Sequence, residues 1–424
     1  MNLVVEKSTL SGKVTIPASK SHTIRAVCIA ALADGQSEIR NPLVANDTLS
    51  AVNGCRAFGA DFVLNDNWTV TGVSNRPAVP DNILDVGNSG TSLYILMGIA
   101  ALCSGYTVFT GDSQIRARPA MPLLDAFNNL GAEAFSTRAN GAAPLVVKGP
   151  MRGGQIELDS SKTSQYLTSL LISCPLAQGD TVIRPKNVIE QPYIEMTLDW
   201  LKGQGIKIER NGFDEFKIPG GQSYKGFNKH IPGDFSSAAF FLCAAAITGD
   251  EIVLEGLDIN DTQGDKAILD MLAAMGAQIR HMPEGILIKG GELRSVELDL
   301  NATPDALPAL AVTACFAEGV TKLVNVPQAR LKETDRISVM AKELSKMGAD
   351  IRELPDGLEI RRSNLKACEL HGWNDHRVVM ALAVAALACE GVTRIDTAES
   401  MRVTFPSFVE LMVRLGAKMA LVSD

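Results

Sequence analysis

A short helix-to-strand joint recurs six times along the chain at intervals of about 70 residues, and this internal repeat constrains the fold more than any other feature. Each copy follows an amphipathic segment and precedes a strand-like one. The copies are Phe58-Gly59-Ala60-Asp61, Leu130-Gly131-Ala132-Glu133, Gln204-Gly205-Ile206-Lys207, Met275-Gly276-Ala277-Gln278, Met347-Gly348-Ala349-Asp350 and Leu415-Gly416-Ala417-Lys418. Glycine suits the residue after a helix, where a positive φ angle is needed, so each joint predicts a helix end.

The other half of the repeat is an apolar, alanine-rich helix that ends in a glycine-containing turn and runs into a β-branched strand, as at Thr181-Val182-Ile183-Arg184. Nearly all of these helices offer Ser, Asn, Asp or Gly as an N-cap. They begin near Lys20-Ser21, Gly87-Asn88-Ser89-Gly90, Ser161-Lys162-Thr163-Ser164, Asp234-Phe235-Ser236-Ser237, Pro304-Asp305 and Asn374-Asp375-His376. Convergent capping explains two or three such matches, but not six at a constant period.

Six repeats of two helices plus strands predict an α/β protein with two domains of three repeats each. The length supports this division, because 424 residues exceed what one hydrophobic core normally holds. The composition, with 46% apolar residues, 21% charged residues and a net charge of −8, is that of an ordinary soluble protein. An acidic chain disfavours a nucleic-acid role, and any anion site must gather its cations locally.

The expected compartment is the reducing cytoplasm. The eight cysteines include no C-x-x-C pair, and several stand in apolar runs, which predicts buried free thiols. Residues 1–7 lack a signal-peptide pattern, and the longest apolar stretch, near 238–247, is too short to span a bilayer. Five histidines without H-E-x-x-H spacing indicate no metal site.

The charged and hydroxyl residues gather at the starts of the apolar helices rather than at the glycine joints. The free N–H groups and the positive end of the helix dipole make such a start an anion site, worth about 0.3–2 kcal/mol per charge. We therefore expect the six starts to converge on one phosphate-rich cleft. Ser19-Lys20-Ser21-His22-Thr23-Ile24-Arg25 places two cations near the first helix start, although a solvated first turn would look the same.

Two motifs late in the chain indicate acid-base chemistry on a phosphorylated substrate. They are Arg330-Leu331-Lys332-Glu333-Thr334-Asp335-Arg336 and Asn374-Asp375-His376-Arg377, with Asp305 upstream. Carboxylates can transfer protons while neighbouring cations hold phosphate. The plain alternative for the first motif is an exposed helix with salt bridges. The glycine-rich helix entry at 87–91 lacks the G-x-x-x-x-G-K-[ST] pattern, so ATP hydrolysis is not indicated.

With these motifs in order from Lys20 to Pro406, the chain resembles the 5-enolpyruvylshikimate-3-phosphate synthases, which are enolpyruvyl transferases. The resemblance implies six βαβαββ units in two similar domains, an inside-out α/β barrel. It places the N-terminal domain at residues 17–231, on the shikimate 3-phosphate side. The C-terminal domain would combine residues 1–16 with 232–424 and complete the phosphoenolpyruvate site at the cleft between the domains.

The resemblance also implies residue roles. Those implied to grip phosphoenolpyruvate are Lys20, Gly90, Arg118, Gln165, Arg336 and Arg377. Those implied to hold shikimate 3-phosphate are Ser21, Arg25, Thr163, Ser164, Gln165, Asp305, Gln328 and Lys332. The implied catalytic set is Lys20, Asp305, Glu333, Asp375 and His376. Asp305 would be the base at the 5-hydroxyl, Lys20 and Glu333 would exchange protons at the methylene carbon, and Asp375 and His376 would support them.

The resemblance implies no cofactor, no metal, no nucleic-acid or membrane partner, and a monomer. Three positions depart from the family pattern. Tyr94 stands where many members have arginine, Glu190 where a serine commonly contacts the shikimate phosphate, and Val403 where some members direct a lysine at phosphoenolpyruvate. Arg402 would replace that lysine only if an expected strand shifted its register by one residue.

Other functions stay open on these departures. One is enolpyruvyl transfer to a different acceptor, including a UDP-amino sugar, although the sister family that uses one has Lys-Asn where this chain has Lys20-Ser21 and a cysteine in the loop around Arg118. Another is a non-catalytic paralogue that binds phosphorylated metabolites.

Overall fold

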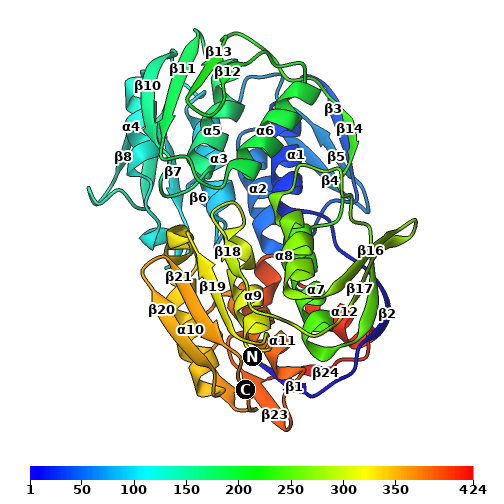
Figure 1. The fold of residues 1–424 in the computed structure, drawn as a ribbon. Helices are drawn as coiled ribbons and strands as arrows, with labels where there is room; N and C mark the ends of the chain where they lie inside the picture. Colours follow the sequence, from blue (N-terminus) through cyan, green and yellow to red (C-terminus); the bar gives the residue numbers. More distant parts are fainter. Residues whose placement is uncertain (424) are drawn as a thin grey trace. The chain divides into compact units, whose positions relative to one another are not determined.

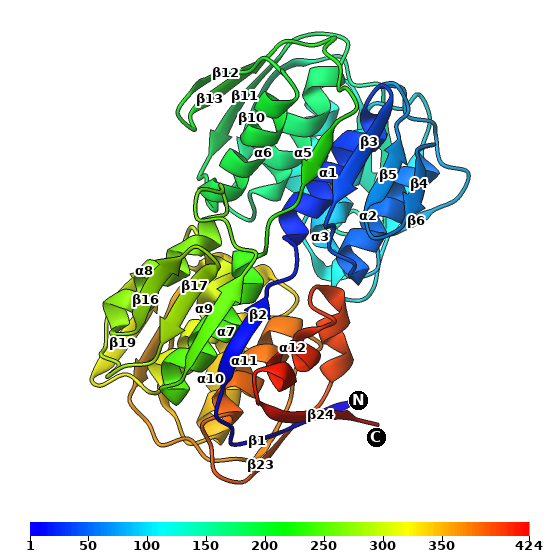
Figure 2. The same ribbon diagram turned by 90° about the vertical axis from the view of Figure 1, so that its right-hand side faces the viewer.

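The chain builds six four-stranded sheets with one shared topology. In each sheet the first two strands are parallel, and the third and fourth are added antiparallel. The computed structural model describes residues 1–423 and divides them into two compact units. We call residues 20–231 the central unit, and residues 1–19 with 232–423 the terminal unit. Figures 1 and 2 show the helices and sheets of each unit.

The central unit contains three βαβαββ repeats. Its helices are α1 (Lys20–Leu32), α2 (Asn46–Ala57), α3 (Gly90–Ala100), α4 (Met121–Asn129), α5 (Gln165–Ser173) and α6 (Gln191–Gly203), with the 3-10 turns η1 (Ile115–Ala117) and η2 (Cys174–Leu176). Its strands are β3 (Gln36–Arg40), β4 (Asp61–Leu64), β5 (Trp68–Thr71), β6 (Leu84–Asp85), β7 (Thr107–Thr110), β8 (Glu133–Ser136), β9 (Leu145–Lys148), β10 (Gly154–Asp159), β11 (Thr181–Lys186), β12 (Glu209–Asn211), β13 (Glu215–Ile218) and β14 (Asn228–His230).

The terminal unit repeats this pattern with two strands from the N-terminus, β1 (Asn2–Glu6) and β2 (Ser11–Thr15). Its helices are α7 (Phe235–Thr248), α8 (Ile268–Met275), α9 (Leu307–Ala314), α10 (Arg336–Lys346), α11 (His376–Ala386) and α12 (Phe408–Arg414), with η3 (Gly264–Ala267), η4 (Pro304–Ala306), η5 (Pro327–Leu331) and η6 (Ala398–Val403). Its other strands are β15 (Glu251–Glu255), β16 (Gln278–Met282), β17 (Gly285–Lys289), β18 (Glu297–Asp299), β19 (Val320–Val324), β20 (Asp350–Leu354), β21 (Gly357–Arg361), β22 (Glu369–Leu370), β23 (Val392–Ile395) and β24 (Lys418–Val422).

One helix of every repeat is buried inside its unit. In the central unit these are α1, α3 and α5, whose residues are almost all inaccessible to solvent (Figure 1). Helices α7, α9 and α11 take the same place in the terminal unit, where they contact one another (Figure 2). Such helices are apolar on all sides, as the alanine-rich segments predicted, because no face meets water. The sheets lie outside them, which explains the term inside-out.

The six glycine joints end helices as predicted. Gly59, Gly131, Gly205, Gly276, Gly348 and Gly416 all have positive φ angles, between 72° and 108°. Each follows the C-terminus of an even-numbered helix, where a side chain would strain the backbone. The other half of the repeat differs in detail from its prediction, because only some of the apolar helices carry a side-chain N-cap.

Side-chain caps occur at three of the apolar helices. Ser89 accepts the N–H of Ser92, and Asp234 and Asp375 do the same for α7 and α11. Helix α5 starts after Ser164, which makes no side-chain cap, and α9 starts after Ala306, at the end of the 3-10 turn η4. The residue type at a helix start therefore predicts a side-chain N-cap less reliably than the repeat period predicts the helix itself.

The closing strands of both units come from distant parts of the sequence. Strand β14 pairs with β3, and β1 lies between β23 and β24. Strand β2 pairs with β15. All eight cysteines are free thiols, and seven of them are buried. None of the helices in residues 1–423 combines the length and the apolar content needed to cross a bilayer.

Candidate active site

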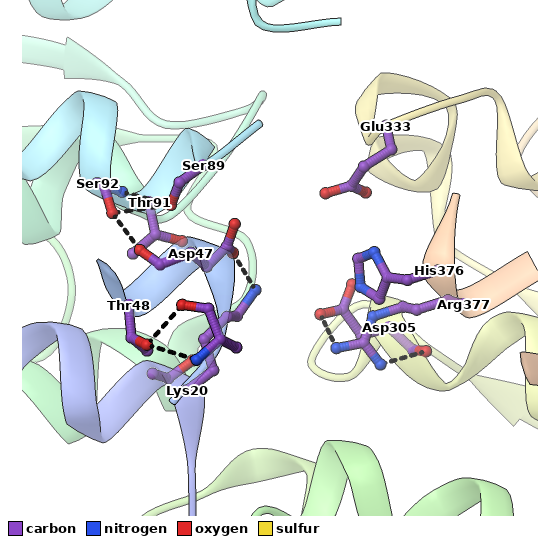
Figure 3. Close-up of polar contacts among 12 residues, drawn as sticks. Lys20, Asp47, Thr48, Ser89, Thr91, Ser92, Asp305, Glu333, His376 and Arg377 are labelled. Atoms are coloured by element: carbon purple, nitrogen blue, oxygen red, sulfur yellow. Dashed lines mark hydrogen bonds and ion pairs between the residues drawn. The ribbon is translucent and has the colours of Figure 1, made fainter. Parts of the chain in front are cut away.

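In the central unit, the first residue of α1 is joined to the first turn of α2 by an ion pair. Lys20 Nζ lies 3.2 Å from Asp47 Oδ2, and the two side chains are only 16% and 7% exposed. Ser92 Oγ, at the start of α3, donates to the Asp47 carbonyl at 3.0 Å (Figure 3). These contacts tie three helix starts together, so the Lys20 ammonium has a defined position.

The start of α3 lies against a second cation. A Cβ atom at Gly90 would come within 2.4 Å of Arg118 Nη1 and 3.1 Å of its Cζ. Only glycine leaves room for the guanidinium beside the first N–H groups of the helix. Arg118 follows η1 and precedes Pro119, in a segment that the repeat pattern alone does not place near Gly90.

The start of α5 adjoins that of α3. Gln165 Nε2 donates to Thr91 Oγ1 at 2.9 Å, and the Gln165 N–H donates to Thr163 Oγ1 at 3.2 Å. Ser164 is buried and donates both its N–H (3.2 Å) and its hydroxyl (2.8 Å) to Glu190 Oε2. Glu190 is 2% exposed, so a carboxylate occupies the positive end of α5 in place of a side-chain cap.

Arg25 is buried and crosses from α1 to α6, with a longer contact to Thr168 Oγ1 of α5 at 3.5 Å. Its guanidinium donates to Thr197 Oγ1 at 2.9 Å, to the Ser21 carbonyl at 2.9 Å and to the Tyr193 carbonyl at 3.0 Å. Burial lowers the pKa of Arg25 to about 10, which leaves it charged at neutral pH. Arg25 therefore supplies positive potential under the start of α1 while most of its N–H groups bind protein oxygens.

In the terminal unit, one buried arginine gathers three carboxylates. Arg336 is 1% exposed and begins α10. Its Nε donates to Asp375 Oδ2 at 2.8 Å, its Nη1 to Asp305 Oδ1 at 2.8 Å and its Nη2 to Glu333 Oε2 at 2.5 Å. The three acidic residues come from segments up to 70 positions apart, the span from 305 to 375. The guanidinium is therefore the centre around which the acidic residues are arranged.

The charges in this cluster depend on one another. Burial acts to lower the pKa of Arg336, but the negative charges of Asp375, Glu333 and Asp305 outweigh it and raise the pKa above its usual value. Burial raises the pKa of Asp375, and the Arg336 charge offsets only part of that rise. Removing one member of such a buried group typically costs about 3–5 kcal/mol, because its partner charge is left unpaired.

A second arginine shares one of these carboxylates. Arg377 Nη2 lies 3.0 Å from Asp305 Oδ2 (Figure 3). The Arg377 backbone N–H donates to Asp375 Oδ1 at 2.9 Å. His376 is 1% exposed, and its Nδ1 lies 4.0 Å from Asp375 Oδ1. The start of α11 thus carries an acid, an imidazole and a cation in succession, as its motif predicted.

The remaining predicted residues lie at two other places. Gln328 is buried in η5 and donates to the Asn301 carbonyl at 3.0 Å, and Lys332 follows η5 half-buried. Ser21 is half-buried in the first turn of α1. Lys332 and Glu333 precede α10 rather than stand in it, and Asp335 caps that helix, so the K-E-T-D-R segment is not an exposed salt-bridge helix.

The predicted residues therefore form two sets, one in each unit. The central set is Lys20, Ser21, Arg25, Gly90, Arg118, Thr163, Ser164 and Gln165. The terminal set is Asp305, Gln328, Lys332, Glu333, Arg336, Asp375, His376 and Arg377. Within residues 1–423, no group of three His, Cys, Asp or Glu side chains is arranged to hold a metal ion.

Comparison with known proteins identifies the family. The family model described as EPSP synthase (3-phosphoshikimate 1-carboxyvinyltransferase) matches residues 4–412. The 3-phosphoshikimate 1-carboxyvinyltransferase of Ruminiclostridium cellulolyticum is 56% identical over 423 residues, with 100% of both chains covered. The chain belongs to the EPSP synthase family.

Other members agree with this result. The protein of the same name from Methanothrix thermoacetophila is 50% identical over 421 residues, with 98% of this chain and 99% of that protein covered. The solved EPSP synthase structure from Acinetobacter baumannii gives a TM-score of 0.83 at 27% identity, covering 99% of this chain and 100% of that one. The match supports the EPSP synthase family over the related transferases that act on a UDP-amino sugar.

One departure from the family pattern needs a correction. We expected Arg402 and Val403 to lie in a strand, with their side chains on opposite sides. The segment Ala398–Val403 is instead the 3-10 turn η6, so the register argument does not apply. The Arg402 guanidinium approaches Met1 Sδ at 4.0 Å, and Val403 is half-buried.

The other two departures have structural partners that the sequence did not reveal. Glu190 accepts from Ser164, as described above, and Tyr94 is buried with its hydroxyl on the Pro119 carbonyl. Asp47 was also missed as the partner of Lys20. Its only signal was an acidic residue in the first turn of a polar helix, a common feature that favours helix formation anyway.

Proposed function

We propose that this member of the EPSP synthase family transfers the enolpyruvyl group of phosphoenolpyruvate to the 5-hydroxyl of shikimate 3-phosphate and releases phosphate. The family match over residues 4–412 supports the reaction class. The assigned residue roles rest mainly on the Arg336 cluster, in which the guanidiniums of Arg336 and Arg377 pair with the carboxylates of the terminal set. The cluster therefore combines two cations with three carboxylates in one unit. Cations for the substrate anions and carboxylates for proton transfer are what this chemistry requires.

The central set supplies positive charge and helix N-termini for the phosphates. Lys20 and Arg118 lie at the starts of α1 and α3, and we assign them to phosphoenolpyruvate together with Gly90 and Gln165. Ser21, Arg25, Thr163 and Ser164 are assigned to shikimate 3-phosphate. Ser164 binds in this role only if the phosphate competes with Glu190 for its two donors, because both already have that carboxylate as acceptor.

The terminal set supplies the proton chemistry. Arg377 and Arg336 bind phosphoenolpyruvate, and Asp305 accepts the proton of the attacking hydroxyl. In the structure both guanidiniums donate to Asp305, so an incoming substrate anion competes with that carboxylate for them. This exchange leaves the Asp305 oxygens available to the 5-hydroxyl. Gln328 and Lys332 complete the set on the acceptor substrate.

The reaction balances as an addition followed by an elimination. A proton supplied by Lys20 or Glu333 adds to the methylene carbon of phosphoenolpyruvate, while the acceptor oxygen bonds to C2 and loses its proton to Asp305. The product of this step is a tetrahedral intermediate that carries a methyl group and the phosphate. The C2–phosphate oxygen bond then breaks and phosphate leaves. The methyl group returns a proton to the Lys20 or Glu333 side chain that supplied one, which restores the double bond as the enol ether.

The Glu190 carboxylate favours one alternative, transfer of the same enolpyruvyl group to a different acceptor. A buried carboxylate at the start of α5 repels an acceptor phosphate placed there, whereas a hydroxyl or amide on the acceptor would be tolerated. The monomeric state, the cytoplasmic location and the absence of a cofactor are expected properties of the protein, and they stay predictions.

The decisive experiment measures phosphate release from phosphoenolpyruvate by purified protein without added metal. We expect release with shikimate 3-phosphate, and none with shikimate or with a UDP-amino sugar as acceptor. Lys20→Ala and Arg377→Ala should each lower kcat by at least about a hundredfold, and Lys7→Ala, an exposed control, should not change it. Release with another acceptor but none with shikimate 3-phosphate would favour the alternative, and no release with any acceptor would contradict both.

A further inference from the structure

Two buried tyrosines of the central unit donate to the same backbone oxygen. Tyr94 Oη lies 2.8 Å from the Pro119 carbonyl, and Tyr166 Oη lies 2.5 Å from it. Tyr94 is 2% exposed and Tyr166 is fully buried. Their rings meet edge to face, with centroids 5.1 Å apart at 87°. A carbonyl oxygen has two lone pairs, so it can accept from both phenols.

The two tyrosines belong to the helices whose starts carry predicted binding residues. Tyr94 stands one turn after Gly90 in α3, and Tyr166 follows Gln165 in α5. Ser169 Oγ of α5 donates to the Tyr94 carbonyl at 2.5 Å. This contact, together with the Gln165 to Thr91 hydrogen bond, fixes α3 against α5. The two hydroxyls therefore come from two helices that are joined by hydrogen bonds.

The oxygen that they hold belongs to the residue after Arg118. Proline restricts its own φ angle to about −65°, so a fixed Pro119 carbonyl also limits the orientation of the Arg118 backbone. The Arg118 side chain then extends to Gly90, where its Nη1 lies 2.4 Å from the position of a Cβ atom. The same pair of helices thus holds the backbone next to Arg118 and receives its guanidinium.

We infer that Tyr94 and Tyr166 are positioning residues for Arg118, and that they hold its guanidinium at the start of α3 to receive the anionic groups of phosphoenolpyruvate. This inference rests on the proposed function, in which Arg118 binds that substrate. It also explains how a buried tyrosine serves at position 94. The phenol contributes no charge to the substrate, but it orients the cation that does.

Both phenols remain donors at neutral pH. Burial raises the pKa of Tyr94 to about 12, and the nearby positive charge of Arg118 offsets part of the rise. Burial also raises the pKa of Tyr166. A phenolate could not donate to the carbonyl, so these shifts preserve the contact across the working range of pH.

The test removes single oxygen atoms. Tyr94→Phe and Tyr166→Phe keep the rings and delete one hydroxyl each, and we expect each to raise the KM for phosphoenolpyruvate by about three- to tenfold. The KM for the acceptor and kcat should change less than twofold. Tyr224→Phe is the matched control, because Tyr224 is also a buried phenol that donates to a backbone carbonyl, that of Ile172, at 2.6 Å. It should lower stability without changing the KM for phosphoenolpyruvate.

Arg118→Ala separates this inference from the proposed function. If Arg118→Ala leaves the KM for phosphoenolpyruvate unchanged, the assigned role of Arg118 is wrong. If it raises that KM and the tyrosine variants do not, Arg118 binds the substrate but the positioning inference is wrong. Tyr94→Phe should add no further increase when combined with Arg118→Ala, since both act through one guanidinium. An undiminished increase in the combined variant would overturn the inference, as would an equal increase in Tyr224→Phe.

Discussion

At the scale of single residues, the candidate site is built from groups whose partners lie far away in sequence. Lys20 meets Asp47, Ser164 meets Glu190, and Arg336 meets Asp375. In each case a charged or hydroxyl group at one helix start is satisfied by a group from a different element. The side chains are therefore oriented before substrate arrives, which lowers the entropy cost of binding.

Gly90 tests how closely Arg118 must approach α3. Gly90→Ala would place a methyl group against the Arg118 guanidinium, and the flexible end of that side chain would shift. We expect a KM for phosphoenolpyruvate about fivefold higher, with less than about 1 kcal/mol lost in the free energy of unfolding. Gly203→Ala is the control, because a Cβ there meets nothing within 4 Å. Steady-state kinetics on both variants test this prediction. If Gly90→Ala and Gly203→Ala have the same KM for phosphoenolpyruvate, the close approach of Arg118 to α3 does not matter for binding.

Tyr94 predicts a specific loss of stability in alkali. Its pKa is raised by burial to about 12 from the ordinary 10, so above pH 10 the unfolded chain ionises this phenol while the folded protein keeps it neutral. Stability from this residue is thus complete below pH 10 and is lost as the pH rises toward 12, by about 1.4 kcal/mol per pH unit.

The measurement compares urea unfolding of the native protein and Tyr94→Phe between pH 9 and 11.5. We expect the advantage of the native protein to shrink as pH rises, because phenylalanine does not titrate. Tyr106→Phe provides the control, since Tyr106 is 49% exposed. Stability curves that stay parallel for the native protein and Tyr94→Phe would contradict the prediction.

At the scale of elements, a short connection positions the terminal cluster. Between β22 and α11, Trp373 and Asn374 both have positive φ angles, 58° and 51°, which is costly for residues other than glycine. Glu343 of α10 accepts hydrogen bonds from this connection. It is fully buried and accepts the His371 N–H and the Trp373 Nε1–H, each at 3.0 Å.

Glu343→Ala should therefore destabilise the terminal unit by about 2–4 kcal/mol, because two part-buried N–H donors and the Lys346 ammonium lose their partner. Glu343→Gln keeps one acceptor oxygen and should lose less. We also expect Glu343→Ala to lower kcat, since Asp375 follows the released connection directly. Denaturant unfolding and kinetics measure the two effects. Glu410→Ala serves as the control, because its side chain is 61% exposed and should change stability by less than about 0.5 kcal/mol.

At the scale of the whole molecule, the N-terminus is part of the core of the terminal unit. Strand β1 is the third strand of a sheet whose other members begin at residue 369. Leu3 in this strand is fully buried, and it pairs with Ile395 on one side and Leu421 on the other. The fold of the terminal unit therefore depends on contacts that join the two ends of the chain.

Leu3→Ala should cost about 2–5 kcal/mol of unfolding free energy, as expected for a buried leucine. Leu421→Ala is the matched control, because Leu421 stands opposite Leu3 but is 41% exposed, and we expect it to cost less than about 1 kcal/mol. Calorimetry should assign the loss to the transition of the terminal unit. Equal shifts in the two variants would show that β1 does not support the core.

The sequence by itself determined the repeat, the class of fold and the family. Two features depend only on local sequence: a glycine where φ is positive, and a helix that is apolar on all sides. Gly59 with its five counterparts and the alanine-rich segments could therefore be recognised from the sequence alone. The motif residues from Lys20 to Arg377 could be proposed in the same way. Their roles stay predictions, although the placement of Lys20, Gly90 and Arg377 at helix starts is observed.

Only the tertiary structure decided which residues meet. Asp47 beside Lys20, Glu190 at the start of α5, and the two tyrosines on the Pro119 carbonyl depend on how different helices pack. The spacing of residues in the sequence does not predict such contacts. Side chains from different helices meet only where the packing of the core brings those helices together. For the same reason the strand expected at Arg402 and Val403 was wrong, since the 3-10 turn η6 forms there, where the chain packs against α11.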